Sequence, residues 1–120
     1  MIRVKRIYEP VSKDDGFRIL VDRLWPRGVS KERAKVDLWL KEIAPSDGLR
    51  NWFSHDPKKW EEFKTKYEHE LEEKTGLFQS ILDAKRKNKT VTLLYSAKDE
   101  EHNQAVALHH ILVRAESTTG

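Results

Sequence analysis

One stretch of the sequence decides the fold: Val91-Thr92-Leu93-Leu94-Tyr95, which Ser96-Ala97-Lys98-Asp99 follows. Its first five residues form a short, nearly continuous apolar run, which is typical of a buried parallel strand. The polar residues after this run predict a loop, and a helix with an apolar face is expected over Glu100–Arg114. A strand, a polar loop and a helix in this order favour an α/β fold.

Further strands are expected earlier in the chain. Met1–Tyr8 alternates apolar and basic residues, and Phe17–Val21 contains a second buried apolar run. The segment 9–16, rich in Pro, Ser, Asp and Gly, predicts the turn between them. Val36–Ala44 fits a strand or a helix face, and we favour a strand because Pro45 ends the segment early.

Helices are expected between the strands: one turn over Ser30–Lys35, a short helix capped by Ser46, and a longer one that begins at Asp56. Thr75-Gly76 indicates a break or kink in the helical pattern, which continues to about Lys87. Strands interleaved with helices predict a small α/β domain with a mainly parallel, three- to four-stranded sheet flanked by helices.

Length and composition agree with one domain, which we place at 1–116, with a flexible C-terminal tail over 117–120. The 120 residues include no Cys, which excludes disulfides, thiolate metal sites and a cysteine nucleophile. No apolar run approaches the roughly 20 residues that a membrane helix needs. The N-terminus lacks a signal-peptide layout. We therefore expect a cytoplasmic protein without a membrane partner.

Ligands of open α/β sheets bind beyond the carboxyl ends of the strands. If the strands Phe17–Val21 and Val91–Tyr95 are parallel neighbours, the loops after them meet. Arg23, Arg27 and Lys98 would then form a cationic pocket for a phosphate- or carboxylate-bearing ligand, because the planar guanidinium fork suits such anions.

Four more residues complete this candidate site. Trp25 and Asn103 join the ligand-binding set, and Trp25 is expected to wall the pocket. His102 and Tyr95 are the candidate catalytic groups, chosen for their position because they could transfer protons there. Whether the protein is an enzyme stays open, and no cofactor is expected.

Two other readings stay open beside this one. Asp22 and Arg23 could simply pair, which would make a structural or protein-interaction domain without catalysis. Alternatively, residues 1–50 carry 12 Lys and Arg against 8 Asp and Glu, and this basic half could associate with nucleic acid. His102 and His109 share a helix face, but no carboxylate completes a recognised spacing, so no metal site is expected.

Several motifs together resemble the YeaO-like family of small proteins, over about residues 2 to 113. They are Val21-Asp22-Arg23-Leu24-Trp25-Pro26-Arg27-Gly28, then Ala44-Pro45-Ser46, Leu49, Trp52-Phe53 and His55, and finally Leu93–Asp99 with His102-Asn103. The resemblance implies a compact α/β fold with its site after the second and last strands. It supplies no activity.

A broader set of similar domains carries Cys-x-Glu after the last strand and Cys-His-Arg in the next helix. The matching positions here are Tyr95-Ser96-Ala97 and Asn103-Gln104-Ala105, so every one of those reactive residues is replaced. The resemblance therefore brings no thiol or metal-thiolate chemistry to this chain.

Overall fold

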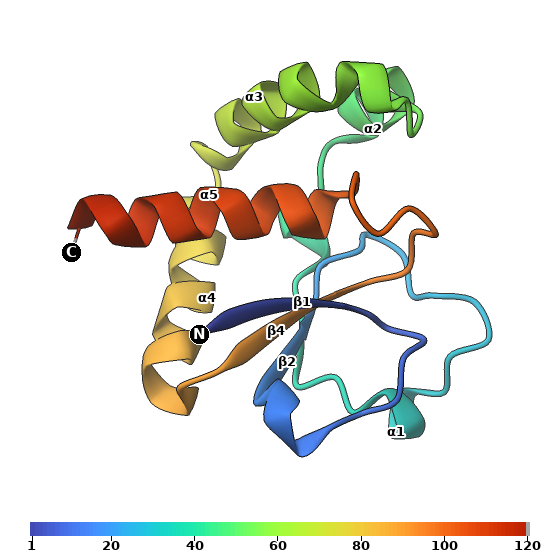
Figure 1. Ribbon diagram of the computed structural model, residues 1–120, viewed down its shortest axis with the longest axis vertical. Coiled ribbons are helices and arrows are strands. Elements are labelled where there is room, and N and C mark those ends of the chain that lie inside the picture. The colour runs from blue at the N-terminus through green and yellow to red at the C-terminus, as the bar shows by residue number, and fades with distance from the viewer. Residues whose placement is uncertain (120) are drawn as a thin grey trace.

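The computed structural model describes residues 1–119, and it describes side chains as far as residue 116. Over this part of the chain, four parallel strands form one sheet in the order β1-β4-β2-β3 (Figure 1). The strands are β1 (Ile2–Arg6), β2 (Phe17–Leu20), β3 (Leu38–Trp39) and β4 (Val91–Tyr95). The α/β fold and the parallel sheet expected from the sequence are confirmed.

The stretch Val91–Tyr95 forms a central strand, and all five of its residues are buried. Leu93 pairs in register with Val4 of β1 on one side and with Ile19 of β2 on the other. This pairing makes β2 and β4 parallel neighbours, so their carboxyl ends lie at the same edge of the sheet.

Helices connect the strands. They are α1 (Lys31–Ala34), α2 (Asp47–Phe53), α3 (Trp60–Leu71), α4 (Thr75–Asn88) and α5 (Gln104–Thr119), with short 3-10 helices η1 (Lys13–Asp15), η2 (Lys41–Ile43) and η3 (Pro57–Lys59). The predicted N-caps Ser30, Ser46 and Asp56 each accept a hydrogen bond from a backbone N–H two or three residues later. Such caps satisfy the free N–H groups of a first turn, so the starts after Ser30 and Ser46 are confirmed. The start predicted at Asp56 is early, because Asp56 caps η3 and α3 begins at Trp60.

The two faces of the sheet are covered very differently. One face carries Ile19, Leu93 and their neighbours, which form the main core with α2, α3, α4 and α5. The other face carries Leu20 and Leu94, which pack in a small cluster with Ala34 of α1 and the loop around it. Figure 1 shows α5 lying along one side of the sheet and the short α1 on the other.

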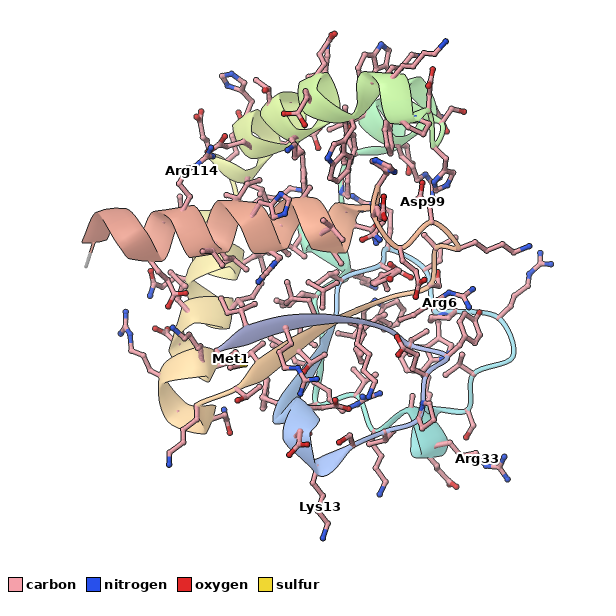
Figure 2. The ribbon with its side chains drawn as sticks, in the orientation of Figure 1. Met1, Arg6, Lys13, Arg33, Asp99 and Arg114 are labelled. Carbon is pink, nitrogen blue, oxygen red and sulfur yellow. The ribbon has the colours of Figure 1, made fainter. Side chains whose placement is uncertain are left out.

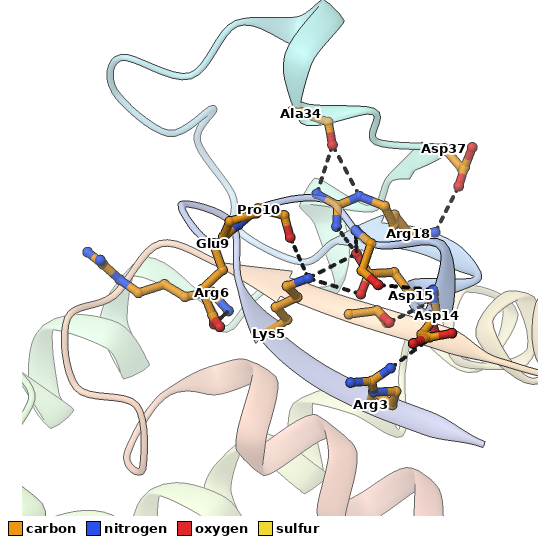
Figure 3. Close-up of polar contacts among 12 residues, drawn as sticks. Arg3, Lys5, Arg6, Glu9, Pro10, Asp14, Asp15, Arg18, Ala34 and Asp37 are labelled. Atoms are coloured by element: carbon orange, nitrogen blue, oxygen red, sulfur yellow. Dashed lines mark hydrogen bonds and ion pairs between the residues drawn. The ribbon is translucent and has the colours of Figure 1, made fainter.

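A buried ion network completes the thinly covered face (Figure 3). The Asp15 carboxylate accepts a 2.6 Å hydrogen bond from Arg18 and lies 3.1 Å from the Lys5 ammonium. Arg18 also donates two hydrogen bonds to the Ala34 carbonyl, at 3.1 and 2.8 Å. Every partner of the buried Arg18 guanidinium is thus an oxygen of the first 34 residues, which anchors α1 to the sheet.

Three other predicted element boundaries are also wrong. Within Val36–Ala44 only Leu38–Trp39 pairs as a strand, because β2 ends at Leu20 and offers nothing further along to pair with. The break near Thr75-Gly76 precedes these residues, since α4 begins at Thr75.

The last helix begins at Gln104 instead of Glu100, because a separate turn occupies the residues before it. Asp99 closes that turn by accepting 2.9 Å hydrogen bonds from the N–H groups of Glu101 and His102. Asn103 then accepts a hydrogen bond from Val106 and caps α5. The backbone of α5 continues to Thr119, Gly120 lies outside the described residues, and the flexible tail over 117–120 stays a prediction.

No helix in the described part of the chain is both long and apolar enough to cross a membrane.

Candidate functional site

A pocket of about 250 Å³ opens where the carboxyl ends of β2 and β4 meet. We call it the strand-end pocket. Its polar lining comes from Asp22, Arg23, Arg50, His55, Ser96 and Gln104, and its apolar lining from Leu24, Ala44, Pro45 and Ala97. Asp22 to Leu24 follow β2, Ser96 and Ala97 follow β4, and Gln104 begins α5, so the fold places the pocket where α/β proteins usually bind ligands.

Arg23 supplies a guanidinium whose hydrogen-bonding capacity is only partly used. Its Nη2 donates to the carbonyl oxygens of Ala44 and Pro45, both at 3.2 Å. Its Nη1 lies 3.7 Å from Glu42, and its Nε lies 3.9 Å from Asp47, but both carboxylates are largely exposed. The Nε atom is buried and has no hydrogen-bond partner among the residues that the structure describes. A buried, unsatisfied donor is costly, so an acceptor at this position would be stabilising.

Arg50 of α2 and His55, two residues after its end, bring two more basic side chains to the pocket. Arg50 lies at an exposed position and pairs loosely, at 3.4 Å, with Asp47. His55 follows the αL C-cap Ser54, and both have positive φ, 47° at Ser54 and 58° at His55. Two consecutive non-Gly residues in this region are strained, and such strain is common at functional sites.

Asp22 is the buried acidic group of the pocket, with 8% of its surface exposed. Its carboxylate accepts a 3.0 Å hydrogen bond from the Ser96 N–H and another from the Gln104 side-chain amide. Burial raises the pKa of Asp22 above its usual value, against the opposing effect of the hydrogen bonds from Ser96 and Gln104. Asp22 does not pair with Arg23, so the ion pair considered for these two residues does not form.

Arg6 fixes the loop after β4 from the edge strand. Its Nε donates to the Ala97 carbonyl at 3.0 Å and its Nη2 to the Ser96 carbonyl at 3.2 Å. The same guanidinium carbon lies 4.6 Å from the Tyr8 ring centroid. Arg6 therefore positions two residues that line the strand-end pocket, although it does not line the pocket itself.

The cations predicted from the sequence do not all meet in one place. Arg23 lines the strand-end pocket, whereas Arg27 and Lys98 are exposed and outside its lining. Trp25 also lies outside, because its indole N–H donates to the Val29 carbonyl at 2.8 Å and its ring packs edge-on against Trp39. Of this loop, only Asp22, Arg23 and Leu24 line the strand-end pocket.

The candidate proton-transfer groups lie beside the strand-end pocket and do not line it. Tyr95 is 3% exposed, and burial raises the pKa of its hydroxyl, to which the Asn103 side chain is hydrogen-bonded. His102 bonds through Nδ1 to Asp99 at 3.0 Å and packs edge-on against Trp60. Asn103 caps α5. Tyr95 and Asn103, which stand where similar domains carry cysteines, are thus joined by a side-chain hydrogen bond.

The sequence reasoning missed Arg50, His55 and Gln104 as pocket residues. Arg50 lies on α2 and His55 just after it, and no local motif signals that they line a pocket with the residues after β2 and β4. Gln104 was expected inside the last helix, so its position as the first helical residue, next to Asp22, went unnoticed.

Lysines cover the faces of the four Trp rings. Trp25, Trp39 and Trp60 each have one Lys ammonium within 5.4 to 5.7 Å of the ring centroid, and Trp52 has two, at 5.1 and 4.9 Å. Such cation–π contacts occupy the surfaces on which a nucleic-acid base would stack. No group of three or more potential metal ligands occurs among the residues that the structure describes.

A larger hollow of about 370 Å³ lies between the C-terminal end of α3, the start of α4 and α5. Its lining is mainly apolar, with Leu71, Phe78 and Ile111, and Glu68 and Arg114 form an ion pair at its rim. It contains none of the residues that follow the strands, and its charged rim is paired within the chain. The strand-end pocket is therefore the better candidate.

Comparison with known proteins agrees with this architecture. The family model described as "Inactive DUF488-N3 subclade" matches residues 1–119. The chain belongs to this family. The uncharacterised protein YeaO of Escherichia coli is 42% identical over 107 residues, which cover 89% of this chain and 92% of YeaO. The resemblance to YeaO-like proteins is confirmed.

The uncharacterised protein Rv3073c of Mycobacterium tuberculosis is 45% identical over 76 residues, or 63% of this chain. That match spans 64% of the relative's length. None of the solved protein structures matches the chain. The family description, with its word "inactive", agrees with the replacement of both cysteine positions by Tyr95 and Asn103.

Proposed function

We propose that this protein binds a small phosphate- or carboxylate-bearing molecule in the strand-end pocket. The observation that carries the proposal is the buried Nε of Arg23, which lacks a hydrogen-bond partner in the described part of the chain. Charge-assisted hydrogen bonds from guanidinium to an anion are among the strongest in proteins. An anion that took the place of the exposed Asp47 carboxylate, 3.9 Å from Nε, would satisfy Nε and keep the bonds from Nη2 to Ala44 and Pro45.

Arg50 and His55 support the same proposal, because they add basic character to the mouth of the pocket. The carboxylates near Arg23, Glu42 and Asp47, are 66% and 71% exposed. Exposed ion pairs contribute little, so a ligand can compete with them. A cytoplasmic location, as expected from the sequence, is part of this proposal. We also propose that the pocket binds its ligand without catalysis by Tyr95 and His102.

The test is a calorimetric titration of wild type and Arg23→Gln with inorganic phosphate, acetate and succinate. We expect at least one of these anions to bind the wild type, with an affinity at least tenfold lower in Arg23→Gln. Arg33→Gln is the matched control, because it removes the same charge from an exposed residue of α1 that points away from the ribbon (Figure 2). Equal binding by Arg23→Gln and Arg33→Gln would exclude the proposal.

A further inference from the structure

Asp22 and Arg23 are consecutive residues that bring opposite charges to one pocket without pairing with each other. The carboxylate of Asp22 takes its hydrogen bonds from neutral donors, namely the N–H and the side chain of Ser96 and the side-chain amide of Gln104. The guanidinium of Arg23 donates to backbone carbonyls from Nη2 and lies 3.7 and 3.9 Å from the exposed carboxylates of Glu42 and Asp47. Its Nε has no hydrogen-bond partner among the described residues. Each group therefore keeps unused capacity for a partner of opposite charge.

Asp22 is the more unusual of the two, because buried carboxylates normally have a cationic partner. Only 8% of its surface is exposed, yet it forms no ion pair with the residues whose side chains the structure describes. A carboxylate has about four acceptor positions, and the Ser96 N–H, the Ser96 side chain and the Gln104 amide use three of them. The remaining capacity lies at the pocket that Asp22 helps to line. A cationic group of a ligand would supply the missing partner.

Four apolar residues line the pocket beside these two charged positions. Leu24, Ala44, Pro45 and Ala97 contribute the apolar lining, and Leu24 is 69% exposed at its rim. An exposed Leu beside two charged residues suits a ligand with an aliphatic part, which a bare inorganic anion lacks. The volume of about 250 Å³ is below the roughly 300 to 1,000 Å³ of pockets for drug-sized molecules.

We infer that the strand-end pocket binds a small zwitterion of amino-acid size, whose ammonium group meets Asp22 and whose anionic group meets Arg23. This inference rests on the proposed function and extends it from any small anion to a molecule with two opposite charges. The anionic group is a carboxylate or a phosphate, which the Arg23 fork accepts equally well. The aliphatic part of the ligand lies against Leu24 and Pro45.

Two matched sets of probes test the inference by calorimetry. Leucine is compared with 4-methylpentanoate, which lacks the ammonium group, and with 3-methylbutylamine, which lacks the carboxylate. O-phosphoethanolamine is compared with ethyl phosphate and ethylamine, so that the two sets distinguish carboxylate from phosphate. In at least one set we expect the wild type to bind the zwitterion at least tenfold more tightly than either single-charge analogue.

Two variants separate the contributions of the charges. In Asp22→Asn, the affinity for the zwitterion should fall to within about twofold of the affinity for its anionic analogue. In Arg23→Gln, the affinities for both ligands should fall at least tenfold. If wild type binds zwitterions and anions with equal affinity and both need Arg23, the inference of a zwitterionic ligand is wrong and the proposed function still holds. Absence of binding by every probe would remove the inference together with the proposed function.

A measurement on the wild type removes any dependence on how well Asp22→Asn folds. The side-chain amide of Gln104 donates to Asp22, so its NMR signal reports directly on that carboxylate. We expect leucine or O-phosphoethanolamine to shift the Gln104 Nε2 signal clearly more than the matched anion does. Equal shifts from the zwitterion and from its anionic analogue would contradict an ammonium group at Asp22.

Discussion

The backbone N–H of Ser96 donates a 3.0 Å hydrogen bond to Oδ2 of Asp22, and this bond joins the loops after β2 and β4. The two strands are neighbours in the sheet, so the bond closes the floor of the strand-end pocket at their carboxyl ends. Arg6 holds the same loop from β1 through the carbonyls of Ser96 and Ala97. Three strands of the sheet thus fix the position of the Asp22 carboxylate.

The buried pair of Asp15 and Arg18 gives the first prediction, which concerns stability. Asp15→Asn removes the charge that faces the Arg18 guanidinium, which is 3% exposed. An unpaired buried charge costs about 3 to 5 kcal/mol of unfolding free energy, measured by urea denaturation. Asp14→Asn is the control, since this neighbour is exposed, and it should change stability by less than about 0.5 kcal/mol. Similar losses in the two variants would show that Arg18 does not depend on Asp15.

The pH dependence of stability should have opposite signs at Asp15 and Asp22. Burial opposes ionisation of Asp15, but hydrogen bonds from Ser12, Lys5 and Arg18 lower its pKa below 3.8. Its contribution is therefore complete above pH 3.8 and is lost as the pH falls through the lowered pKa. Burial raises the pKa of Asp22, so the folded protein keeps the Asp22 carboxyl protonated to a higher pH than the unfolded chain does. The contribution of Asp22 to stability is therefore lost as the pH rises from 3.8 through the raised pKa.

Unfolding curves of wild type, Asp15→Asn and Asp22→Asn between about pH 2 and pH 7 measure both effects. The advantage of wild type over Asp15→Asn should shrink on acidification. The stability of wild type relative to Asp22→Asn should rise on acidification. The same sign in both comparisons would be inconsistent with the environments that the structure gives these carboxylates.

Two glycines with similar φ angles should respond differently to Ala. Gly16 has φ +63°, and an added Cβ would lie 2.2 Å from the carbonyl oxygen of Thr90. Gly28 has φ +72°, and no described atom lies within 4 Å of its added Cβ. Gly28→Ala should cost about 1 to 2 kcal/mol for the left-handed backbone alone. Gly16→Ala should cost distinctly more in the same denaturation assay, because the strand-end backbone must also move.

The hydroxyl of Tyr67 provides a prediction for the core. It donates a 2.7 Å hydrogen bond to the buried carbonyl of Ile43, and burial raises its pKa strongly. Tyr67→Phe leaves that carbonyl unsatisfied and should cost about 1 to 3 kcal/mol of unfolding free energy. Tyr8→Phe removes a comparable bond from a side chain that is 46% exposed, so it should cost much less. A larger loss for Tyr8→Phe would contradict this assignment of burial.

Much of the fold can be predicted from the sequence, because local sequence patterns indicate most of its strands and helices. The apolar run Val91–Tyr95 predicts a strand by composition alone, and Ser46 predicts the start of α2 by its capping chemistry. Asp56 predicts only the 3-10 helix η3 that precedes α3. The start of α5 was misplaced because the acidic residues 99–101 suit a first helical turn. In the structure, Asp99 instead accepts the His102 N–H and closes a separate turn, and the Asn103 side chain donates to the Asp99 carbonyl.

The candidate site was only partly predictable. Arg23 follows a strand, so its place at the carboxyl edge of the sheet follows from topology. Arg27 lies four residues further along, and its distance from β4 depends on the path of the loop. Arg50 lies on α2 and His55 just after it, and local sequence patterns do not encode that they line the strand-end pocket.

The Nε–H group of Arg23 is the most direct reporter of the central claim, that the strand-end pocket binds an anion. Its NMR signal can be followed in wild type during titration with phosphate, acetate and leucine. We predict a progressive, saturable shift of the Arg23 Nε–H signal with at least one of these ligands, and no comparable shift at Arg33. An Arg23 signal that does not move, or that moves only as Arg33 does, would contradict the account.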